Sequence, residues 1–491
     1  MAKKRFNSLE RRLESNPDLR DKYAANMSEM QKKGYIEEVA EAVPPAIKRV
    51  WYLPHHPVCS DKKPGKVRIV YDCAAKFGGV SLNDVLLQGP DLTNSLIGVL
   101  MRFREENIAV MADIEGMFLQ VVVAEEDRDS LQFYWRPVQG QEVKTYRMTR
   151  HLFGATSSPA CSNKALLSTA TDNGHKYGLE TVNAIKHNFY VDDCLSSVAD
   201  YEKAVTLFHD LTNICRDGGF RLTKWMSNNK DVLSTVPLEE RAKEVKSLDL
   251  SKDDLPMERA LGVQWLPEND TFSFNITPAE KTKILLQEVC RKGLEWDEPV
   301  DGVLLQRWKQ WLQELLKLKE WSVSRCYKSG ISPVIISRQL HVFADASDKG
   351  YGMAAYLRQE DSDGHVQTSL VMGRSRVASI KYTSIPRLEL TAAVMAARLT
   401  ETVLAELGDI SDVYYWTESQ TVLKYIQNTS RRFKIFVANR VAVILNLSKP
   451  SQWMYVRTSN NPADEASRGQ KIEDFLRNTR WKDGPEYLNQ S

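Results

Sequence analysis

The sequence lacks the features that define several large classes of protein. It contains no run of about 18 consecutive apolar residues, so no membrane-spanning helix is expected. Its first residues, MAKKRFNSLERRLES, include no apolar core of signal-peptide length. Its seven cysteines are an odd number with no CxxC spacing, so neither a disulfide framework nor a zinc knuckle is visible. These absences predict a soluble protein that is not secreted and keeps its thiols reduced.

Common nucleotide-binding and nucleophile motifs are also missing. The chain has no GxGxxG, no GxSxG and no P-loop, so a dehydrogenase or an α/β hydrolase finds no support. A net charge of only +2 argues against a histone-like polybasic binder. Nucleic acid is not excluded, because local basic stripes beside a polymerase's own carboxylates cancel in the total. The 491 residues, 42% of them hydrophobic, predict roughly two to four domains with real cores.

The hydrophobic pattern divides the chain into segments. Residues 1–43 read as helix up to a Pro-Pro pair. IAVMADIEGMFLQVVV predicts a buried strand, a turn and a second strand, and NFYVDDCLSSV predicts a hairpin with an acidic pair near its tip. The Leu- and Trp-rich residues 279–321 predict helices, whose Trp spacing favours a packing core over a base-stacking platform. After Gly330, strands followed by interleaved helices and strands indicate a separate α/β domain.

Three carboxylates of the first half fit the needs of phosphoryl transfer. Transfer onto a hydroxyl uses two divalent ions about 4 Å apart, held by carboxylates on rigid backbone. Asp113 closes the apolar run IAVMA, where a charge is costly to bury without a partner or a metal. Asp192 and Asp193 are adjacent like charges at a predicted hairpin tip, and they repel without a cation. For a lone Asp-Asp pair, ordinary turn chemistry is the alternative.

Longer phrases around these residues favour the catalytic interpretation. The phrases KVRIVYDCAAKFGGVSLNDVLLQGPDL, VMADIEGMFLQV, HLFGATSSPACSNKAL, NFYVDDCL, FRLTKW and ALGVQW occur in the order found in BEL/Pao retrotransposon reverse transcriptases. The chain resembles this family nearly end to end. The resemblance implies a DNA polymerase whose catalytic, metal-binding carboxylates are Asp113, Asp192 and Asp193, with Lys224 near the leaving pyrophosphate.

The same resemblance assigns further substrate contacts. It places Arg68, together with Lys66, at the triphosphate of the incoming nucleotide. Phe118, five residues after the first catalytic Asp, falls at the position of the aromatic steric gate against the 2′-hydroxyl. Phe153 and Gly154 fall in the block that holds template and nucleotide.

A second set of phrases carries a second resemblance. FADASDKGYGMAAYL, PRLEL, YYWTESQTVL and NPADEASRG are similar, in order, to the ribonuclease H domain of the same polyprotein. The implied catalytic and metal-binding residues are Asp345, Glu389, Glu418 and Asp464. Taken singly, each would more often be a surface acid, but four in matching frames favour the fold. The resemblance implies two Mg²⁺ in each active site, with Mn²⁺ as an alternative ion.

Three departures from the family's pattern bear on activity. Glu418 stands where relatives carry Asp; its carboxylate moves by about 1.5 Å, and misplacements of about 1 Å can cost roughly a hundredfold in rate. NITPAEKTK runs straight into ILLQEVCRKGLEW, where relatives have an additional block with a DPLGLLAP-like phrase. Leu119 replaces a usual His, a minor change. We therefore expect reduced RNA hydrolysis and impaired processive copying.

The sequence thus predicts an α+β right-hand polymerase (fingers, palm and thumb) followed by an α/β ribonuclease H-like domain. The predicted domains are an N-terminal helical segment 1–49, reverse transcriptase fingers, palm and partial thumb 50–276, shortened connection helices 277–335, a ribonuclease H-like domain 336–470, and a C-terminal tail 471–491.

The leading hypothesis is an RNA- and DNA-directed DNA polymerase with an attached ribonuclease H-like domain, acting on template–primers and deoxynucleoside triphosphates. The alternative is a catalytically crippled retroelement remnant that only binds nucleic acid. No protease motif precedes these domains and no integrase follows them, which predicts a polyprotein fragment. The family implies the cytosol or cytoplasmic virus-like particles and no membrane partner, whereas the oligomeric state is not indicated.

Overall fold

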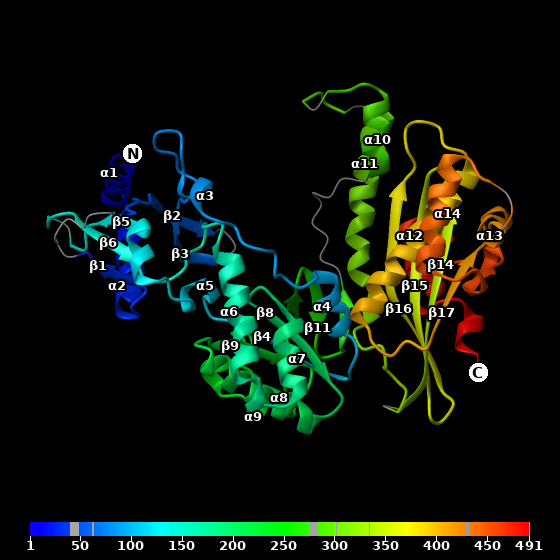
Figure 1. Cartoon of the computed structure of the whole chain (residues 1–491), viewed down its shortest axis with the longest axis horizontal. Helices are drawn as coiled ribbons and strands as arrows, with labels where there is room; N and C mark the ends of the chain where they lie inside the picture. The colour runs from blue at the N-terminus through cyan, green and yellow to red at the C-terminus, as the bar shows by residue number, and fades with distance from the viewer. Residues whose placement is uncertain are drawn as a thin grey trace. The chain divides into compact units, whose positions relative to one another are not determined.

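The chain folds into two compact units in the computed structural model (Figure 1). The structure describes residues 1–39, 49–60, 63–138, 140–273, 283–295, 297–300, 302–332, 334–428, 430 and 432–490. One unit comprises residues 1–94, 112–194 and 207–224, and the other comprises residues 95–111, 195–206 and 225–491. No described helix combines the length and the hydropathy that a membrane span requires.

The first unit begins with two helices and a strand, whereas the sequence predicted one helix over 1–43. These are α1 (Ala2–Glu14), α2 (Pro17–Lys32) and β1 (Ile36–Glu38). The break has a local cause: the Asn16 side chain accepts a hydrogen bond from Leu19 N (3.1 Å), and Pro17 takes the first position of the new helix. The Pro-Pro pair that was expected to end the helix lies in 40–48, outside the described residues.

These N-terminal elements share a core with the strands that follow them. Strands β1, β6 (Lys144–Met148) and β5 (Gln132–Trp135) form a sheet in that order, and β2 (His55–Ser60) pairs with β3 (Lys63–Tyr71). Phe6 and Leu13 of α1 and Tyr23 of α2 pack in one buried cluster with Tyr71 and Phe133. A boundary at residue 49 therefore does not separate an independent segment, because the helices bury their apolar faces against these strands.

A four-stranded sheet carries the first set of predicted catalytic residues. Its order is β7 (Phe189–Tyr190), β8 (Asp193–Val198), β4 (Ile108–Ile114) and β9 (Leu222–Ser227). The antiparallel pairing of β7 with β8 confirms the predicted hairpin. In the chain, helices α6 (Ser158–Asn173) and α7 (Leu179–His187) lie between β4 and β7, and α8 (Tyr201–Asp217) lies between β8 and β9.

The second unit contains a small sheet and two helices between the predicted polymerase and ribonuclease segments. Strands β10 (Glu258–Ala260), β11 (Val263–Leu266), β12 (Thr271–Ser273) and β13 (Ser322–Ser324) pair in that order, which confirms the hairpin predicted in ALGVQWLPENDTFSF. Helices α10 (Lys283–Arg291) and α11 (Gly302–Leu315), with the 3-10 turn η4 (Leu316–Glu320), occupy the Leu- and Trp-rich stretch. Trp321 is buried, in agreement with the packing interpretation, whereas Trp308 and Trp311 of α11 are only half-buried. The predicted boundary at 276/277 and Trp296 lie outside the described residues.

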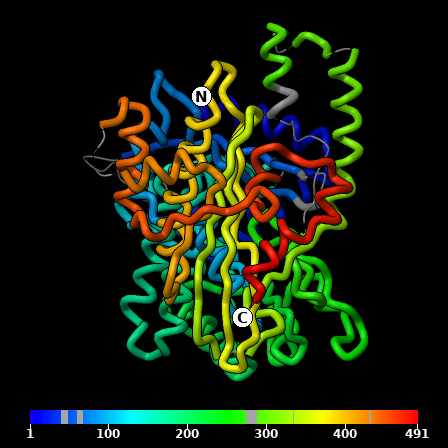
Figure 2. Tube along the Cα trace, turned by 90° about the vertical axis from the view of Figure 1, so that its right-hand side faces the viewer, coloured from blue at the N-terminus to red at the C-terminus, as the bar shows by residue number. Residues whose placement is uncertain are grey.

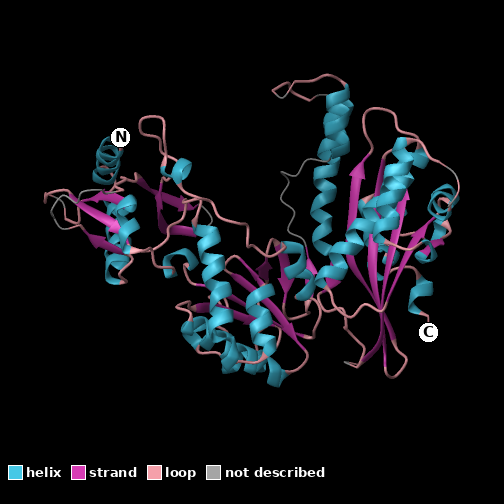
Figure 3. Cartoon of the chain, in the orientation of Figure 1, coloured by secondary structure: helices cyan, strands magenta, loops and turns pink. Residues whose placement is uncertain are grey.

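A mixed five-stranded sheet dominates the rest of the second unit, as Figure 3 shows. Its order is β16 (Val366–Val377), β15 (Gly350–Asp361), β14 (Ile335–Ala346), β17 (Asp412–Thr417) and β18 (Trp453–Tyr455). The strands β14, β15 and β16 run antiparallel, whereas β17 is parallel to β14 and β18 is parallel to β17. Helix α12 (Ile385–Glu406) packs its alanine-rich buried face on the sheet, and α13 (Gln420–Gln427) and α14 (Ile435–Leu447) complete the core.

The C-terminal segment is part of this unit, although the sequence predicted a tail over 471–491. It forms α16 (Ile472–Arg477), α17 (Thr479–Asp483) and the 3-10 turn η7 (Glu486–Asn489), which lie along the sheet (Figure 2). Leu488 is 2% exposed in a cluster with Phe343 and Tyr356. Its carbonyl oxygen accepts a hydrogen bond from Arg358 Nε at 3.0 Å. The segment thus covers apolar sheet surface that would otherwise face water.

Candidate active sites

The first candidate site lies where β4 meets the β7–β8 hairpin. Asp113 is the penultimate residue of β4, Asp192 lies in the turn of the hairpin, and Asp193 begins β8. The amide of Ile114 donates a hydrogen bond to the carbonyl of Asp192 at 2.8 Å, which fixes the two carboxylate-bearing segments side by side. The three predicted polymerase carboxylates therefore come from adjacent backbone, although they are distant in sequence.

The backbone at this site is strained. Val191, just before the two aspartates, has φ of 57°, a left-handed conformation that a β-branched residue rarely adopts. Lys224 in β9 also has φ of 57°. Such conformations cost on the order of 1–3 kcal/mol each and persist where surrounding structure fixes them, commonly at functional sites.

The local electrostatics disfavour ionised carboxylates. The pKa of Asp193 is raised from 3.8 to about 6, chiefly by burial and also by the charges of Asp192 and Asp113, against the opposing charge of Lys224. The pKa of Asp192 is raised as well, chiefly by burial. A divalent cation would reverse both effects because it stabilises the ionised form.

Lys224 places a positive charge beside the carboxylate of Asp113. Its Nζ lies 2.6 Å from Asp113 Oδ2, and its side chain is otherwise largely exposed. Among the described residues, two sets of three His, Cys, Asp or Glu side chains bring ligand atoms within 4.8 Å of one another, and the trio Asp113, Asp192 and Asp193 is neither of them. In this conformation the lysine, rather than a third carboxylate, is the close neighbour of Asp113.

The predicted substrate-contact residues group unevenly around the first site. The ring centroids of Phe118 and Phe153 lie 4.7 Å apart, so the residue predicted as steric gate contacts one predicted to hold template and nucleotide. Gly154 has φ of 106°, and a Cβ there would lie 2.9 Å from the Tyr71 carbonyl oxygen, so only glycine fits this close approach. Arg68 is exposed on β3. Lys66 lies in β3, and its side chain is outside the described residues.

The second candidate site gathers carboxylates from three elements. Asp345 lies in β14, Glu418 follows β17, and Asp464 lies in α15 (Ala463–Arg468). Each offers a carboxylate oxygen, and these atoms lie within 4.8 Å of one another. Glu418 thus reaches the cluster despite its additional methylene. The chemistry of three converging hard oxygen donors fits a divalent ion such as Mg²⁺ or Mn²⁺.

Glu389, the fourth predicted residue, stands apart from that close set. It lies in α12 and is half-buried. Its Oε2 accepts a hydrogen bond from the Ser419 hydroxyl at 2.6 Å, and Ser419 immediately follows Glu418. This bond brings the α12 carboxylate next to the segment that carries Glu418.

Burial again raises a pKa at the second site. Asp345 is 6% exposed, and its pKa is raised from 3.8 to about 6, first by burial and then by the charges of Glu418 and Asp464. The Ser467 hydroxyl donates a hydrogen bond to Asp345 and partly opposes the shift. The site holds negative charge that the protein leaves only partly compensated.

Sequence reasoning missed the hydroxyl and amide donors around these carboxylates. Thr458 Oγ1 donates to Glu418 Oε2 at 2.6 Å, and Asn461 Nδ2 donates to Glu418 Oε1 at 3.0 Å. Asn461, Ser467 and Asp464 belong to the phrase NPADEASRG, so the phrase itself was the available signal. Nothing in the sequence pointed to Thr458.

The other close set of potential metal ligands lies in a turn. Asp361, Asp363 and His365 lie at the end of the β15–β16 hairpin. The Asp361 carboxylate accepts backbone N–H bonds from Ser332, Asp363 and His365 at 2.9, 2.9 and 2.8 Å. These bonds account for its burial and explain its lowered pKa.

Comparisons with known proteins support the ribonuclease H-like domain and the overall fold. Residues 273–419 match the family model described as Pao retrotransposon-like RNaseH-like domain. No curated protein sequence matches the chain significantly.

Several solved structures resemble the chain in fold. The foamy viral protease-reverse transcriptase dRH in complex with ds DNA has a TM-score of 0.54 at 14% identity, and the match covers 87% of this chain and 68% of that one. The foamy viral protease-reverse transcriptase in complex with dsDNA gives 0.52 at 15% identity, covering 88% and 81%. With RNA/DNA hybrid, it gives 0.52 at 14% identity, and the chain spans only 52% of that protein. The chain therefore shares the fold of these reverse transcriptases over most of its length, and its residues 273–419 match an RNaseH-like domain.

Proposed function

We propose that this chain is the reverse transcriptase–ribonuclease H region of a BEL/Pao-type retroelement and works as an RNA- and DNA-directed DNA polymerase with an attached ribonuclease H. The match of residues 273–419 to the Pao retrotransposon-like RNaseH-like domain and the likeness in fold support this proposal. The observation that carries the proposal is the juxtaposition of Asp113 with the Tyr-Val-Asp-Asp hairpin through the Ile114–Asp192 backbone hydrogen bond. The foamy viral relatives hold double-stranded DNA or RNA/DNA hybrid, which supports a template–primer as the partner of this chain.

At the proposed polymerase site, the positions of the predicted residues support a separate role for each. Asp113, Asp192 and Asp193 would hold the ions that the reaction requires. Bound Mg²⁺ would lower the pKa of the primer 3′-hydroxyl and neutralise charge on the departing pyrophosphate. Lys224, now 2.6 Å from Asp113, is placed to contact the same anionic group once the carboxylate is engaged elsewhere. Phe118, packed on Phe153, would exclude a 2′-hydroxyl by occupying its space.

At the ribonuclease site, Asp345, Glu418 and Asp464 would hold a metal ion, and Glu389, next to them through its hydrogen bond with Ser419, would be a fourth ligand. Bound divalent ions would activate water and stabilise the charge that develops on the scissile phosphate. Ser467 orients Asp345, while Thr458 and Asn461 orient Glu418. These hydrogen bonds restrict the rotamers of carboxylates that must act together.

Primer extension tests the polymerase proposal. Extension on an RNA template with Mg²⁺ should fall by at least a hundredfold in the Asp192→Asn/Asp193→Asn variant, because the ions lose their ligands. Asp172→Asn changes an exposed aspartate of α6 in the same way and should extend like the unaltered protein. Equal extension by all three proteins, or none by any, contradicts the proposal.

A catalytically crippled remnant that only binds nucleic acid is the second candidate, favoured by Glu418. If it is correct, the protein binds an RNA/DNA hybrid in a salt-dependent manner but neither extends the primer nor cleaves the RNA strand. Glu418→Asp restores the family's residue and should raise RNA-strand cleavage if the longer side chain has displaced the carboxylate. Unchanged cleavage would show that the extra methylene is tolerated.

A further inference from the structure

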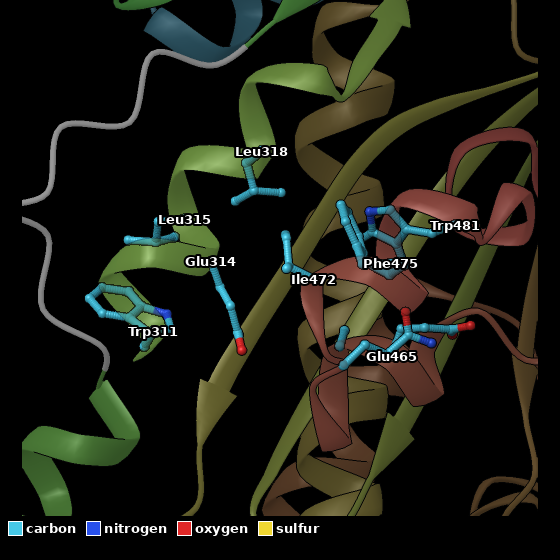
Figure 4. Close-up of a pocket in the computed structure, with 10 residues that line it drawn as sticks. Trp311, Glu314, Leu315, Leu318, Glu465, Ile472, Phe475 and Trp481 are labelled. Atoms are coloured by element: carbon cyan, nitrogen blue, oxygen red, sulfur yellow. The ribbon is translucent and has the colours of Figure 1, made fainter. Parts of the chain in front are cut away.

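A cavity beside the second carboxylate site has the character of a ligand pocket. It has a volume of about 290 Å³ and lies between α11 with η4 on one side and α15 to α17 on the other (Figure 4). Its lining residues are Trp311, Glu314, Leu315, Leu318, Glu465, Ala466, Gln470, Ile472, Phe475 and Trp481. The volume is close to the lower end for small-molecule pockets, about 300 Å³.

The walls combine flat aromatic surface with negative charge. Trp311 faces Phe475 and Trp481 across the cavity, as the sticks in Figure 4 show. Glu314 and Glu465 are the charged residues of the lining, and none of its described members is basic. Glu314 extends from α11 toward the segment that carries Ile472 (Figure 4). Aromatic walls with carboxylates favour a flat cation over a neutral or anionic group.

Glu465 closes the cavity on the side of α15. Its side chain is only 3% exposed, and its Oε1 accepts N–H groups from Asn478 and Arg480, so Arg480 balances its charge. Its Oε2 is buried, without a hydrogen-bond partner among the described residues and without surface that a ligand could reach. Glu314, whose Oε1 accepts a hydrogen bond from Gln310 at 2.8 Å, is therefore the carboxylate of the lining that can meet a ligand cation.

The same short helix serves both the cavity and the carboxylate site. In α15, Glu465 and Ala466 line the cavity, whereas Asp464 belongs to the carboxylate set and Ser467 bonds Asp345. The helix sits tightly on β15, since a Cβ built on Gly352 would lie 2.5 Å from the Ala466 Cβ. A ligand that displaces α15 would therefore displace Asp464 as well.

We propose that this cavity binds an aromatic compound with a protonated amine or amidine, and that occupancy weakens metal binding at the Asp345–Glu418–Asp464 site. The geometry assigns the aromatic ring to Trp311, Phe475 and Trp481, and the cation to Glu314. The coupling to RNA cleavage rests on the proposed ribonuclease function, whereas the binding itself does not.

Binding is tested with a pair of probes that differ in charge alone. Benzamidine should bind the full-length protein with a Kd on the order of 1 mM, measured by saturation-transfer NMR, and benzoate should bind at least tenfold more weakly. Leu315→Trp fills the cavity and should abolish benzamidine binding, and Glu314→Gln should weaken it about fivefold. Glu320→Gln changes an exposed glutamate of η4 outside the lining and serves as the matched control.

Equal binding of the two probes, or binding that survives Leu315→Trp, overturns the pocket assignment. Coupling is measured by calorimetric titration of Mn²⁺ into the Asp192→Asn/Asp193→Asn variant, in which the ribonuclease site dominates. Saturating benzamidine should weaken Mn²⁺ binding at least threefold, and Mn²⁺ should weaken benzamidine binding by the same factor. An unchanged or tighter Mn²⁺ affinity overturns the coupling. Because neither measurement needs turnover, an inactive ribonuclease would refute the proposed function and leave this result intact.

Discussion

Replacing the buried carboxylate Asp345 by an amide should stabilise the second unit at neutral and alkaline pH. The folded-state pKa of Asp345 is raised from 3.8 to about 6. At about 1.36 kcal/mol per pKa unit, ionised Asp345 lowers the free energy of unfolding by about 3 kcal/mol. Because the folded pKa exceeds the unfolded one, stability is fully present below pH 3.8 and is lost as pH rises toward about 6.

The raised pKa already includes the hydrogen bond from Ser467, which favours the ionised form. The Asp345→Asn variant should therefore be more stable than the unaltered protein by about 3 kcal/mol at pH 8, and by less than about 1 kcal/mol at pH 4. Saturating Mn²⁺ should reverse the order at pH 8, since only the carboxylate form gains the ion.

Hydrogen exchange resolves this effect within a chain of two units. The slowest-exchanging amides of β14 and α12 report the opening free energy of the unit that contains Asp345. Asp363→Asn, at an exposed aspartate in the β15–β16 turn, is the matched control and should show no comparable pH-dependent gain. If Asp345→Asn lowers protection at pH 8, or changes it equally at pH 4 and pH 8, the argument from burial is refuted.

Two further predictions follow from packing. Gly154→Ala should destabilise the first unit by about 1–3 kcal/mol in denaturant titrations, because its φ of 106° and the Tyr71 carbonyl 2.9 Å from a new Cβ oppose any side chain; Gly79→Ala, at φ of 87° but with nothing within 4 Å, should cost less. Leu488→Ala should lower the stability of the second unit by about 2–5 kcal/mol, measured by the same hydrogen exchange; a loss below 1 kcal/mol would mean that the C-terminal segment is only loosely attached.

The sequence predicted those parts of the fold whose local and distant signals agree. The Tyr-Val-Asp-Asp hairpin, the β11–β12 hairpin and the buried Trp321 are all found, because period-2 patterns and apolar spacing are read locally. The prediction of one continuous N-terminal helix was wrong at Asn16. There a capping residue followed by proline starts a new helix within a continuous polar pattern. The prediction of a C-terminal tail was wrong for a different reason. The apolar residues of this segment are too few to show a periodicity, and the residues they pack against lie in distant strands.

The same distinction between local and distant signals applies to the candidate sites. The carboxylate positions of both sites followed from phrases, whereas the donors that orient them are set by tertiary contacts. The cavity between α11 and α15 had no sequence signal at all, since its walls come from segments about 150 residues apart in the chain. Spatial convergence of that kind is invisible to any local pattern.

The structure also sharpens the consequence of Glu418. The sequence predicted a displaced carboxylate, yet Glu418 joins Asp345 and Asp464 within 4.8 Å. Its two oxygens are engaged separately, Oε2 by Thr458 and Oε1 by Asn461, and an aspartate one methylene shorter would not span both donors in the same way. A carboxylate already held by two donors gives up hydrogen bonding when it turns its lone pairs to a metal ion. A reduction in RNA cleavage would then arise from competition between these donors and the ion rather than from reach, and Thr458→Val, which removes one donor, should raise the affinity for Mn²⁺. A lowered affinity in that variant would instead assign Thr458 the role of orienting the ligand.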